Sequence, residues 1–412
     1  MSGTGGAEGW ARGTAAVDYE ARVDMAALRA GRLVRARRAL ADANLDAVLV
    51  WKDENVRYLT SLRPQLIAGK SGLLNGALLP REGGPILFVS GGDRDRAQAT
   101  MPWVEEFHAI PILEEPGLVH HFASAIVPGV LARHGLPRAR IGLDLTSKLL
   151  GDQLAASCPG VRWVDGDAAM QAARRIKTGE ELAVLEEATA LAEAVTATAL
   201  AHIRPGVREC EVAGEALRTL LRLGGEYAHV TTPFVASGER LAPPTRLATD
   251  KLIRDGDLVF VDIGAMWNGY FGDIGRTVVC GTPSAEQRRV YRAVWEGLQA
   301  GIAAMRPGAT NMEVARAIHD RAAAHGLREH FLSLFIGHGI GCGSNEPPYI
   351  GEIFPGAASV TLEAGMVFAL EPLIWLPGVR GGGGVRLEDM VAVTETGARC
   401  LSRSPYAAEL LA

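Results

Sequence analysis

The chain has little cysteine, and its cysteines follow no familiar binding pattern. They number five in 412 residues, an odd count, and no two of them form a CxxC pair. A disulfide framework or a zinc knuckle would need paired spacings of that kind, so both are excluded. We expect five reduced thiols in a cytoplasmic protein, at Cys158, Cys210, Cys280, Cys342 and Cys400.

The chain also lacks an excess of basic residues and any long apolar run. Its formal net charge is −5, whereas nucleic-acid-binding proteins carry clustered positive charge, so we expect no nucleic-acid partner. No apolar run is long enough to span a bilayer, and the glycine-rich start lacks the apolar core of a signal peptide, so we expect no membrane association. Residues 1–17 are predicted to be a flexible tail.

Residues 18–165 alternate between helical and strand-like patterns. Apolar positions recur at helical spacing over 21–44 and 118–134. Short apolar runs typical of buried strands occur at 45–51, 76–79, 85–89 and 141–145. This alternation predicts an α/β domain. No glycine motif for phosphate follows its first strand, so we expect no nucleotide site there.

Residues 166–412 form the second predicted domain, which opens with a long helical stretch, 165–202, and contains an internal repeat. Arg-Pro-Gly occurs at 204–206 and again at 306–308, and each copy is followed at the same distance by Glu-Val-Ala. In each copy one helix should end, the chain should turn, and another helix should begin. Two related halves packed about a pseudo-twofold axis would account for the repeat, with a site at their junction.

A β-hairpin that carries two acids is predicted around Asn268-Gly269, the favoured two-residue turn between apolar strands. Counting outward from this turn pairs Gly264 with Asp273 and Asp262 with Gly275. Cross-strand partners share a face, so the two acids should be diagonal neighbours on one side of the hairpin. Two carboxylates placed in this way repel each other unless a cation lies between them.

Three further candidate metal ligands follow along the chain. His338 stands between glycines, and imidazole is the commonest metal ligand. Glu371 ends an apolar, strand-like run. Glu388 lies inside another such run, 385–393, where strand alternation puts it on one face with Arg386. An acid at such a position is costly to bury without a partner, so these residues and the hairpin acids predict a two-ion site.

These motifs resemble a known enzyme family. The order Asp, Asp, His, Glu, Glu, within DIG, GYFGDIGRT, GHGIG, LEP and VRLED, is similar to that of the methionine aminopeptidase, aminopeptidase P, prolidase and creatinase superfamily. Segment 32–62 also resembles the start of the creatinase-type N-terminal domain, and segment 175–182 resembles the usual entry to the catalytic domain. The resemblance implies an α/β (α+β) fold, with a creatinase-type N-terminal α/β domain before a pita-bread catalytic domain of two pseudo-symmetric halves. It also implies a homodimer.

The same resemblance implies metallopeptidase chemistry. The implied metal ligands are Asp262, Asp273, His338, Glu371 and Glu388, with Asp273 and Glu388 bridging two divalent ions. Two such ions, about 3.5–4 Å apart, lower the pKa of a bridging water, whose hydroxide attacks an amide carbonyl. Glu371 would take and return the proton. Oxygen-rich ligation favours Mn²⁺, with Fe²⁺, Co²⁺ or Zn²⁺ as alternatives.

Two positions depart from the family pattern. Its peptidases carry two further histidines that contact the substrate, and this chain has Thr245 and Asn345 there. Neither can carry a positive charge, so oxyanion stabilisation worth about 2.7–4 kcal/mol per donor would be partly lost. Thr245 and Asn345 therefore join Glu371 as candidate catalytic residues. His229 could replace a missing imidazole, although we expect a structural role. The candidate substrate-binding residues are Arg240, Arg246, Tyr270, Glu346 and Arg386.

Two enzymatic functions and one non-enzymatic function follow from these observations. The first is a dinuclear-metal hydrolase of the Xaa-Pro dipeptidase or aminopeptidase P type, acting on short peptides. The second is a family member that acts on a small metabolite, as a C–N hydrolase similar to creatinase or an ectoine hydrolase, or as a C–S lyase. The third is a non-catalytic binding module, but such relatives have typically lost metal ligands that this chain retains.

Overall fold

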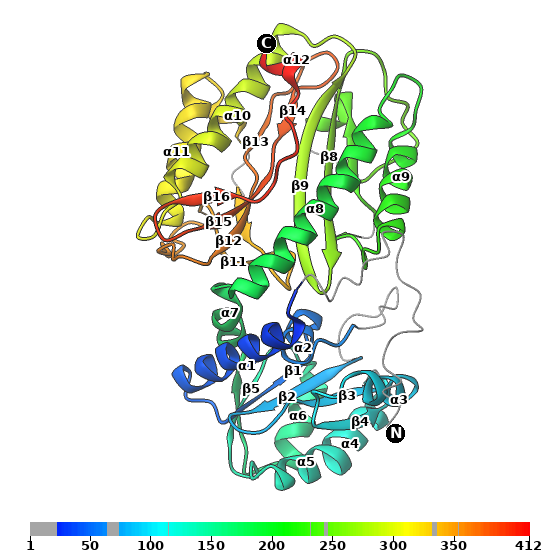
Figure 1. Ribbon diagram of the computed structural model, residues 1–412, viewed down its shortest axis with the longest axis vertical. Coiled ribbons are helices and arrows are strands. Elements are labelled where there is room, and N and C mark those ends of the chain that lie inside the picture. Colours follow the sequence, from blue (N-terminus) through cyan, green and yellow to red (C-terminus); the bar gives the residue numbers. More distant parts are fainter. Residues whose placement is uncertain are drawn as a thin grey trace, which may run out of the picture. The chain divides into compact units, whose positions relative to one another are not determined.

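The structure is a computed structural model that describes residues 23–63, 74–113, 115–230, 232–242, 246–331, 336–352 and 354–412. The chain divides into two compact units, shown in Figure 1. The N-terminal unit comprises residues 29–178 and 340–347. The C-terminal unit comprises 179–339 and 348–412, with a piece that ends at Leu28. The predicted tail and Thr245 lie outside the described residues.

A six-stranded sheet forms the centre of the N-terminal unit, in the order β4-β3-β2-β1-β5-β6. Strand β2 is antiparallel to both neighbours, and the outer pairs are parallel. All four predicted strands and the α/β class are confirmed. The elements are α1 (Met25–Asp42), β1 (Ala47–Val50), α2 (Asp53–Thr60), β2 (Gly76–Pro80), β3 (Ile86–Ser90), α3 (Gly91–Thr100), β4 (Glu106–Ile110), α4 (Pro116–His121), η2 (Phe122–Ile126), α5 (Val127–Arg133), β5 (Arg140–Leu143), α6 (Lys148–Ser157), β6 (Arg162–Asp165) and α7 (Asp167–Arg175).

The two edge strands, β4 and β6, were not predicted from the sequence. Edge strands tolerate exposed and charged side chains, as at Arg162 and Asp165, and therefore lack an apolar pattern. The single helix predicted over 118–134 is divided into α4, the π-helical turn η2 and α5. Pro128, in the first turn of α5, cannot donate a backbone hydrogen bond, and the wider turn accommodates it.

Helix α7 belongs to the N-terminal unit, although the sequence placed residues 166–178 in the second domain. Its inner face is buried, and the Tyr58 hydroxyl donates to the Ala173 carbonyl at 3.0 Å. The long helix predicted over 165–202 is thus two helices, α7 and α8, with a break between them. No helix in the described parts of the chain is long and apolar enough to cross a membrane.

The C-terminal unit contains a three-stranded sheet, β7-β8-β9, a five-stranded sheet, β11-β10-β12-β15-β16, and a pair, β13-β14. Helix α8 runs across the long β8–β9 hairpin (Figure 1). The elements are α8 (Gly179–Ala201), α9 (Glu209–Arg222), β7 (Phe234–Ser237), η3 (Gly238–Leu241), β8 (Asp257–Trp267), β9 (Tyr270–Cys280), α10 (Ala285–Ala304), α11 (Asn311–Ala324), η4 (Arg328–His330), β10 (Gly337–Gly339), β11 (Glu346–Tyr349), β12 (Val367–Leu370), β13 (Leu373–Trp375), β14 (Gly384–Arg386), β15 (Asp389–Val393), β16 (Ala398–Cys400) and α12 (Ala408–Leu411).

Both copies of the predicted repeat fold in the same way. Each RPG turn lies between two helices, α8 and α9 in the first copy and α10 and α11 in the second. The turn glycines, Gly206 and Gly308, have positive φ angles of 88° and 85°. Their amides donate to equivalent carbonyls, those of Ile253 at 2.9 Å and Leu362 at 3.0 Å. The repeat in the amino-acid sequence is therefore also a repeat in the structure.

Gly272 permits the close approach of β9 to helix α8. A Cβ atom at this position would lie 2.4 Å from the Ala188 carbonyl oxygen. We expect Gly272→Ala to lower the free energy of unfolding by about 1–3 kcal/mol, because backbone atoms would have to separate. The control is Gly214→Ala within α9, where no atom lies within 4 Å and a gain of about 0.5–1 kcal/mol is expected. Urea unfolding measures both, and equal effects would contradict the packing argument.

Candidate metal centre

The hairpin has the predicted register, so Asp262 and Asp273 lie diagonally on one face, each opposite a glycine. The turn at Asn268-Gly269 has the two positive φ angles, 48° and 80°, that a two-residue hairpin of this kind requires. Both acids are almost completely buried. The register prediction is confirmed, because turn geometry alone fixes which residues face each other.

The glycines opposite the two acids make room for other side chains. A Cβ atom at Gly264 would lie 2.4 Å from His229 Nδ1, and one at Gly275 would lie 2.8 Å from Glu388 Oε2. Any larger residue at either position would displace one of these groups. The hairpin thus accepts an imidazole over one glycine and a carboxylate over the other.

Glu371 and Glu388 lie where two antiparallel strand pairs meet end to end. The pairing of β12 with β15 and that of β13 with β14 share one register, which puts Glu371 opposite Glu388 in the gap between the pairs. The sequence predicted one continuous strand over 385–393. That prediction is wrong at Glu388, because the chain there leaves one sheet and enters another.

Backbone groups at this break form hydrogen bonds with residues of β9. The Thr277 hydroxyl accepts from the Arg386 amide at 3.1 Å and donates to the Arg386 carbonyl at 2.9 Å. The Glu388 amide donates to the Gly275 carbonyl at 3.0 Å, and Arg276 Nη1 donates to the Glu388 carbonyl at 2.6 Å. Because unpaired buried backbone groups are costly, these bonds fix the position of Glu388.

Arg276 is held in turn by the C-terminal segment. Its Nη2 pairs with Asp389 Oδ1 at 2.8 Å and donates to the Ser404 carbonyl at 2.7 Å. The Tyr406 hydroxyl donates to the other Asp389 oxygen at 2.5 Å. Arg276 is therefore committed to this network, and its ion pair within the described chain is with Asp389.

His338, in the middle of β10, has the protonation state of a metal ligand. Burial lowers the pKa of His338 to about 4, so the ring is neutral at neutral pH. Its Nδ1 lies 3.0 Å from the Gly339 carbonyl, which can only accept, so Nδ1 carries the proton. The lone pair therefore lies on Nε2, which faces Glu371 Oε1 at 3.4 Å.

The electrostatics of the cluster fit a cation. Burial, and next the neighbouring acids, raise the pKa of Asp273 and of Glu388 well above the usual range. One oxygen of each carboxylate lacks a hydrogen-bond donor, namely Asp262 Oδ1, Asp273 Oδ1, Glu371 Oε1 and Glu388 Oε2. The one cation paired directly with these acids in the described chain is Arg386, which contacts Asp262 Oδ2 at 2.7 Å and also Glu371. One guanidinium does not balance four ionised carboxylates, so their full ionisation would require a further cation.

Two groups of side chains in the described residues have the spacing of a metal site. One contains His229, Asp262 and Asp273, and the other contains Asp273, His338 and Glu388. Within each group the ligand atoms lie within 4.8 Å of one another. Asp273 belongs to both groups, so its carboxylate lies at the centre of the cluster.

His229 is the residue of this cluster whose place the sequence did not predict. It lies over Gly264, with Nε2 3.9 Å from Asp262 Oδ1 and Nδ1 3.9 Å from Asp273 Oδ1. Burial lowers the pKa of His229, although Asp262 opposes this shift. No sequence motif surrounds His229. The one feature of the sequence that could have indicated its position is Gly264, over which the ring lies.

Two residues predicted to bind substrate have partners inside the C-terminal unit. Arg386 pairs with Asp262 and Glu371, so its charge is used within the carboxylate cluster. Tyr270 donates its hydroxyl to Glu181 of α8 at 2.8 Å. Strand alternation puts Tyr270 on the opposite face of β9 from Asp273, which is against the prediction.

The two arginines of the 240–246 segment differ in their surroundings. Arg240 pairs with the buried Glu209 at 3.2 Å and donates to the Leu247 carbonyl at 2.6 Å, so its guanidinium is committed to holding this segment. Arg246 is exposed, and its guanidinium lies 5.7 Å from the centre of the Phe234 ring. That ring packs edge-on against His229. Arg246 therefore stays a candidate for binding an anionic substrate group.

Asn345 and Glu346 lie in the 340–347 segment, which is part of the N-terminal unit although Glu346 also begins strand β11. Asn345 is exposed and accepts from the Ser344 hydroxyl at 3.2 Å. Glu346 is buried and pairs with Arg174 at 2.8 Å and with Lys177 at 3.7 Å. Its two cationic partners hold the pKa of Glu346 below the usual range, against the effect of burial. The carboxylate thus anchors the segment that carries Asn345.

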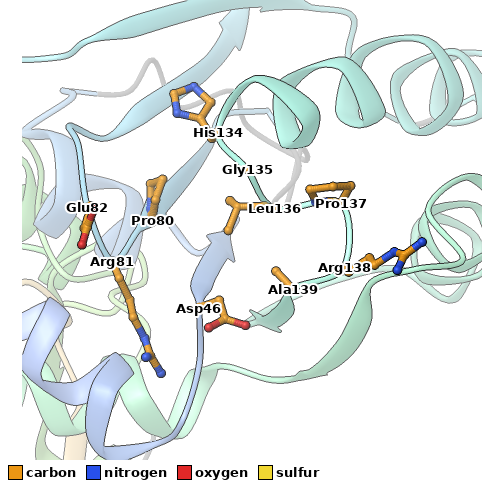
Figure 2. Close-up of a pocket in the computed structure, with 10 residues that line it drawn as sticks. All are labelled: Asp46, Pro80, Arg81, Glu82, His134, Gly135, Leu136, Pro137, Arg138 and Ala139. Carbon is orange, nitrogen blue, oxygen red and sulfur yellow. The ribbon is translucent and has the colours of Figure 1, made fainter.

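A cavity of about 440 Å³ in the N-terminal unit lies between the end of β2 and the segment after α5 (Figure 2). Two of its polar side chains are engaged elsewhere: His134 pairs with Glu106 at 2.7 Å, and Asp46 accepts from the Arg140 amide at 2.8 Å. None of the candidate site residues lines it. We therefore do not assign the function to this cavity.

Comparison with known proteins agrees with the cluster. Residues 183–395 match metallopeptidase family M24, and residues 32–176 match the creatinase/prolidase N-terminal domain. The chain belongs to metallopeptidase family M24. It is therefore a metal-dependent hydrolase with a creatinase-type N-terminal domain and an M24 catalytic domain, which confirms the family and the fold class implied by the resemblance.

The similarity extends over nearly the whole chain. A Bacillus subtilis protein described as the uncharacterized peptidase YqhT is 31% identical over 376 residues, covering 91% of this chain and 98% of its own. An Xaa-Pro dipeptidase of Pyrococcus horikoshii is 29% identical, covering 88% and 93%. The structure of an Xaa-Pro dipeptidase from Bacillus anthracis aligns with a TM-score of 0.77 and 26% identity, covering 92% and 98%.

Replacing Asp273 by Asn should stabilise the metal-free protein and remove the stabilising effect of divalent ions. Because burial and the neighbouring acids raise the pKa of Asp273, ionising this carboxyl in the folded state costs free energy, about 1.4 kcal/mol for each tenfold weakening of the acid. This cost is absent below about pH 4, where both folded and unfolded forms are protonated, and grows as pH rises through the folded pKa. The increase in the free energy of unfolding caused by Asp273→Asn should therefore also grow as pH rises.

Thermal unfolding with EDTA or with Mn²⁺, measured at several pH values from about 4 to 8, tests both effects. Asp320→Asn, at an exposed acid on α11, is the control and should change neither quantity. Retention of full stabilisation by Mn²⁺ in the Asp273 variant would contradict a shared ligand.

Proposed function

We propose that the chain is a dinuclear-metal hydrolase of Xaa-Pro dipeptides. The observation that carries this proposal is the cluster of four buried carboxylates, each with one oxygen that lacks a donor, beside a neutral imidazole. The proposed ligands are Asp262, Asp273, His338, Glu371 and Glu388. The choice of substrate rests on the full-length similarity to proteins described as Xaa-Pro dipeptidases.

Two divalent ions held here would supply an activated water and positive charge for the developing oxyanion. The chain's own residues would do the rest. Glu371 is buried and has an oxygen that lacks a donor, so we propose that it takes the proton of the attacking water and returns it to the leaving nitrogen. Arg386 holds Asp262 in place, and the exposed Arg246 is proposed to attract the substrate carboxylate.

Three finer properties belong to the same proposal. We propose Mn²⁺ as the physiological ion, because four of the five ligands are carboxylates. We propose a homodimer, on the family resemblance. We propose a cytoplasmic location: the five cysteines, which all lie in described parts of the chain, form no disulfide with one another, as is usual in a reducing compartment.

The alternative function is hydrolysis or lyase cleavage of a small metabolite. The observation that favours it is the presence of Thr245 and Asn345 at the two positions where peptidases of the family carry histidine. A pocket without those two imidazoles has fewer groups that stabilise a peptide-derived oxyanion. The two functions share the metal cluster and differ in substrate.

Substrate assays of Mn²⁺-loaded protein separate the two functions. We expect hydrolysis of Xaa-Pro dipeptides in preference to longer Xaa-Pro peptides, small amidines and betaines. Glu371→Gln should lower turnover by about 10²–10⁴-fold, because the proton carrier is lost. Glu329→Gln, at an exposed position, is the control. Turnover of a small metabolite with no cleavage of any prolyl substrate would replace the proposal with the alternative.

Restoring the missing imidazole at residue 345 should raise peptidase activity. Asn345 is exposed, so Asn345→His is expected to fold normally and to increase kcat/KM for Xaa-Pro dipeptides by about tenfold or more, the effect of part of one oxyanion donor. Ser344→His places the same ring one residue away and serves as the control. A loss of activity in Asn345→His alone would indicate a pocket adapted to other chemistry.

A further inference from the structure

His229 and His338 are the two imidazoles of the carboxylate cluster, and their hydrogen bonds fix opposite tautomers. The partner of His338 Nδ1 is a carbonyl, which can only accept. The partner of His229 Nδ1 is the Gly264 amide, which can only donate and lies 2.6 Å away. His338 therefore has its lone pair on Nε2, whereas His229 in its neutral form has a proton there.

Because of this difference in tautomer, His338 Nε2 can bind a metal ion, whereas His229 Nε2 can donate a hydrogen bond. Metal binding through an imidazole nitrogen requires a lone pair on that nitrogen. The lone pair of His229 Nδ1 is used by the Gly264 amide, and Nε2 carries the proton. The spacing of His229, Asp262 and Asp273 would admit an ion, but the backbone bond removes the nitrogen lone pair that the ion would need.

The position of the His229 ring is determined by the surrounding fold. The ring occupies the space above Gly264 that any Cβ would fill, and its edge packs against Phe234 with the ring centres 5.4 Å apart. Only 9% of the His229 side chain is exposed. Its Nε2 lies 3.9 Å from Asp262 Oδ1, the buried oxygen that lacks a donor, while Arg386 holds the other oxygen of the same carboxylate.

We propose that His229 is a positioning residue of the metal centre, which directs an Nε2–H group at Asp262 and so orients this ligand without binding an ion itself. The proposal rests on the proposed metal site but not on any particular substrate. Nε2 and Oδ1 are less than about 1 Å beyond hydrogen-bond distance, so a small rotation of the carboxylate when an ion binds would complete the bond. Donors of this kind typically change metal affinity by about 10–100-fold.

Substitution of His229 by Asn or by Gln separates the two roles of the ring, which are to accept from the Gly264 amide and to donate toward Asp262. His229→Asn keeps an acceptor near the position of Nδ1 for the Gly264 amide and loses the donor. His229→Gln places an N–H near the position of Nε2 and keeps the donor. We expect the Asn variant to bind Mn²⁺ about 10–100-fold more weakly in calorimetric titration, and the Gln variant to retain most of the affinity. His319→Asn is the matched control, since that ring also packs edge-on against a phenylalanine but lies on α11.

The absorption spectrum of the Co²⁺-loaded protein supplies the readout that a merely structural role would not change. The Gln variant should keep the wild-type spectrum, because the ligand set is unchanged. Loss of a nitrogen ligand in both variants would overturn the proposal and make His229 a ligand. Wild-type Mn²⁺ affinity in the Asn variant would overturn it as well. Neither measurement uses a substrate, so failure of the dipeptidase proposal would leave this test intact.

Discussion

The burial of four carboxylates beside one another is the constraint on which the C-terminal unit depends. Asp262 and Asp273 come from the β8–β9 hairpin, and Glu371 and Glu388 come from a junction between two strand pairs. Arg386 offsets part of their charge, and Arg276 also lowers the pKa of Glu388, but burial and then the neighbouring acids keep the pKa values of Asp273 and Glu388 above the usual range. Divalent ions held by these acids, as proposed, would relieve both, and ion binding would then be linked to the stability of this unit.

The surrounding fold holds the acids together against this repulsion. Thr277 and Arg276 bond the backbone on either side of the strand break, and the C-terminal segment bonds Arg276 in turn. The glycines of the hairpin let Glu388 and His229 approach where a side chain would exclude them. The geometry of these carboxylates is thus set by backbone hydrogen bonds and by close packing.

The hairpin shows which parts of the site were predictable from sequence. The turn residues fixed the register, and the register put Asp262 and Asp273 on one face, because both rules are local. Glu388 was correctly predicted to join the cluster, but strand alternation within one continuous strand was the wrong reason. It lies at the break between β14 and β15. Tyr270 was assigned to the substrate, but strand alternation turns it toward α8. Strands β4 and β6 were missed, because charged edge strands lack an apolar pattern.

The sequence by itself determined the family, the fold class, the internal repeat and the hairpin with its two acids. These depend on residue type and spacing within short segments, which any reader of the chain can count. Only the tertiary structure brought His229 to Asp262, opposed Glu371 to Glu388 and committed Arg276 to the C-terminal segment. These contacts join residues far apart in the chain, and their atoms meet only after the sheets have formed. The tautomer of each imidazole is a consequence of the backbone group that it meets there.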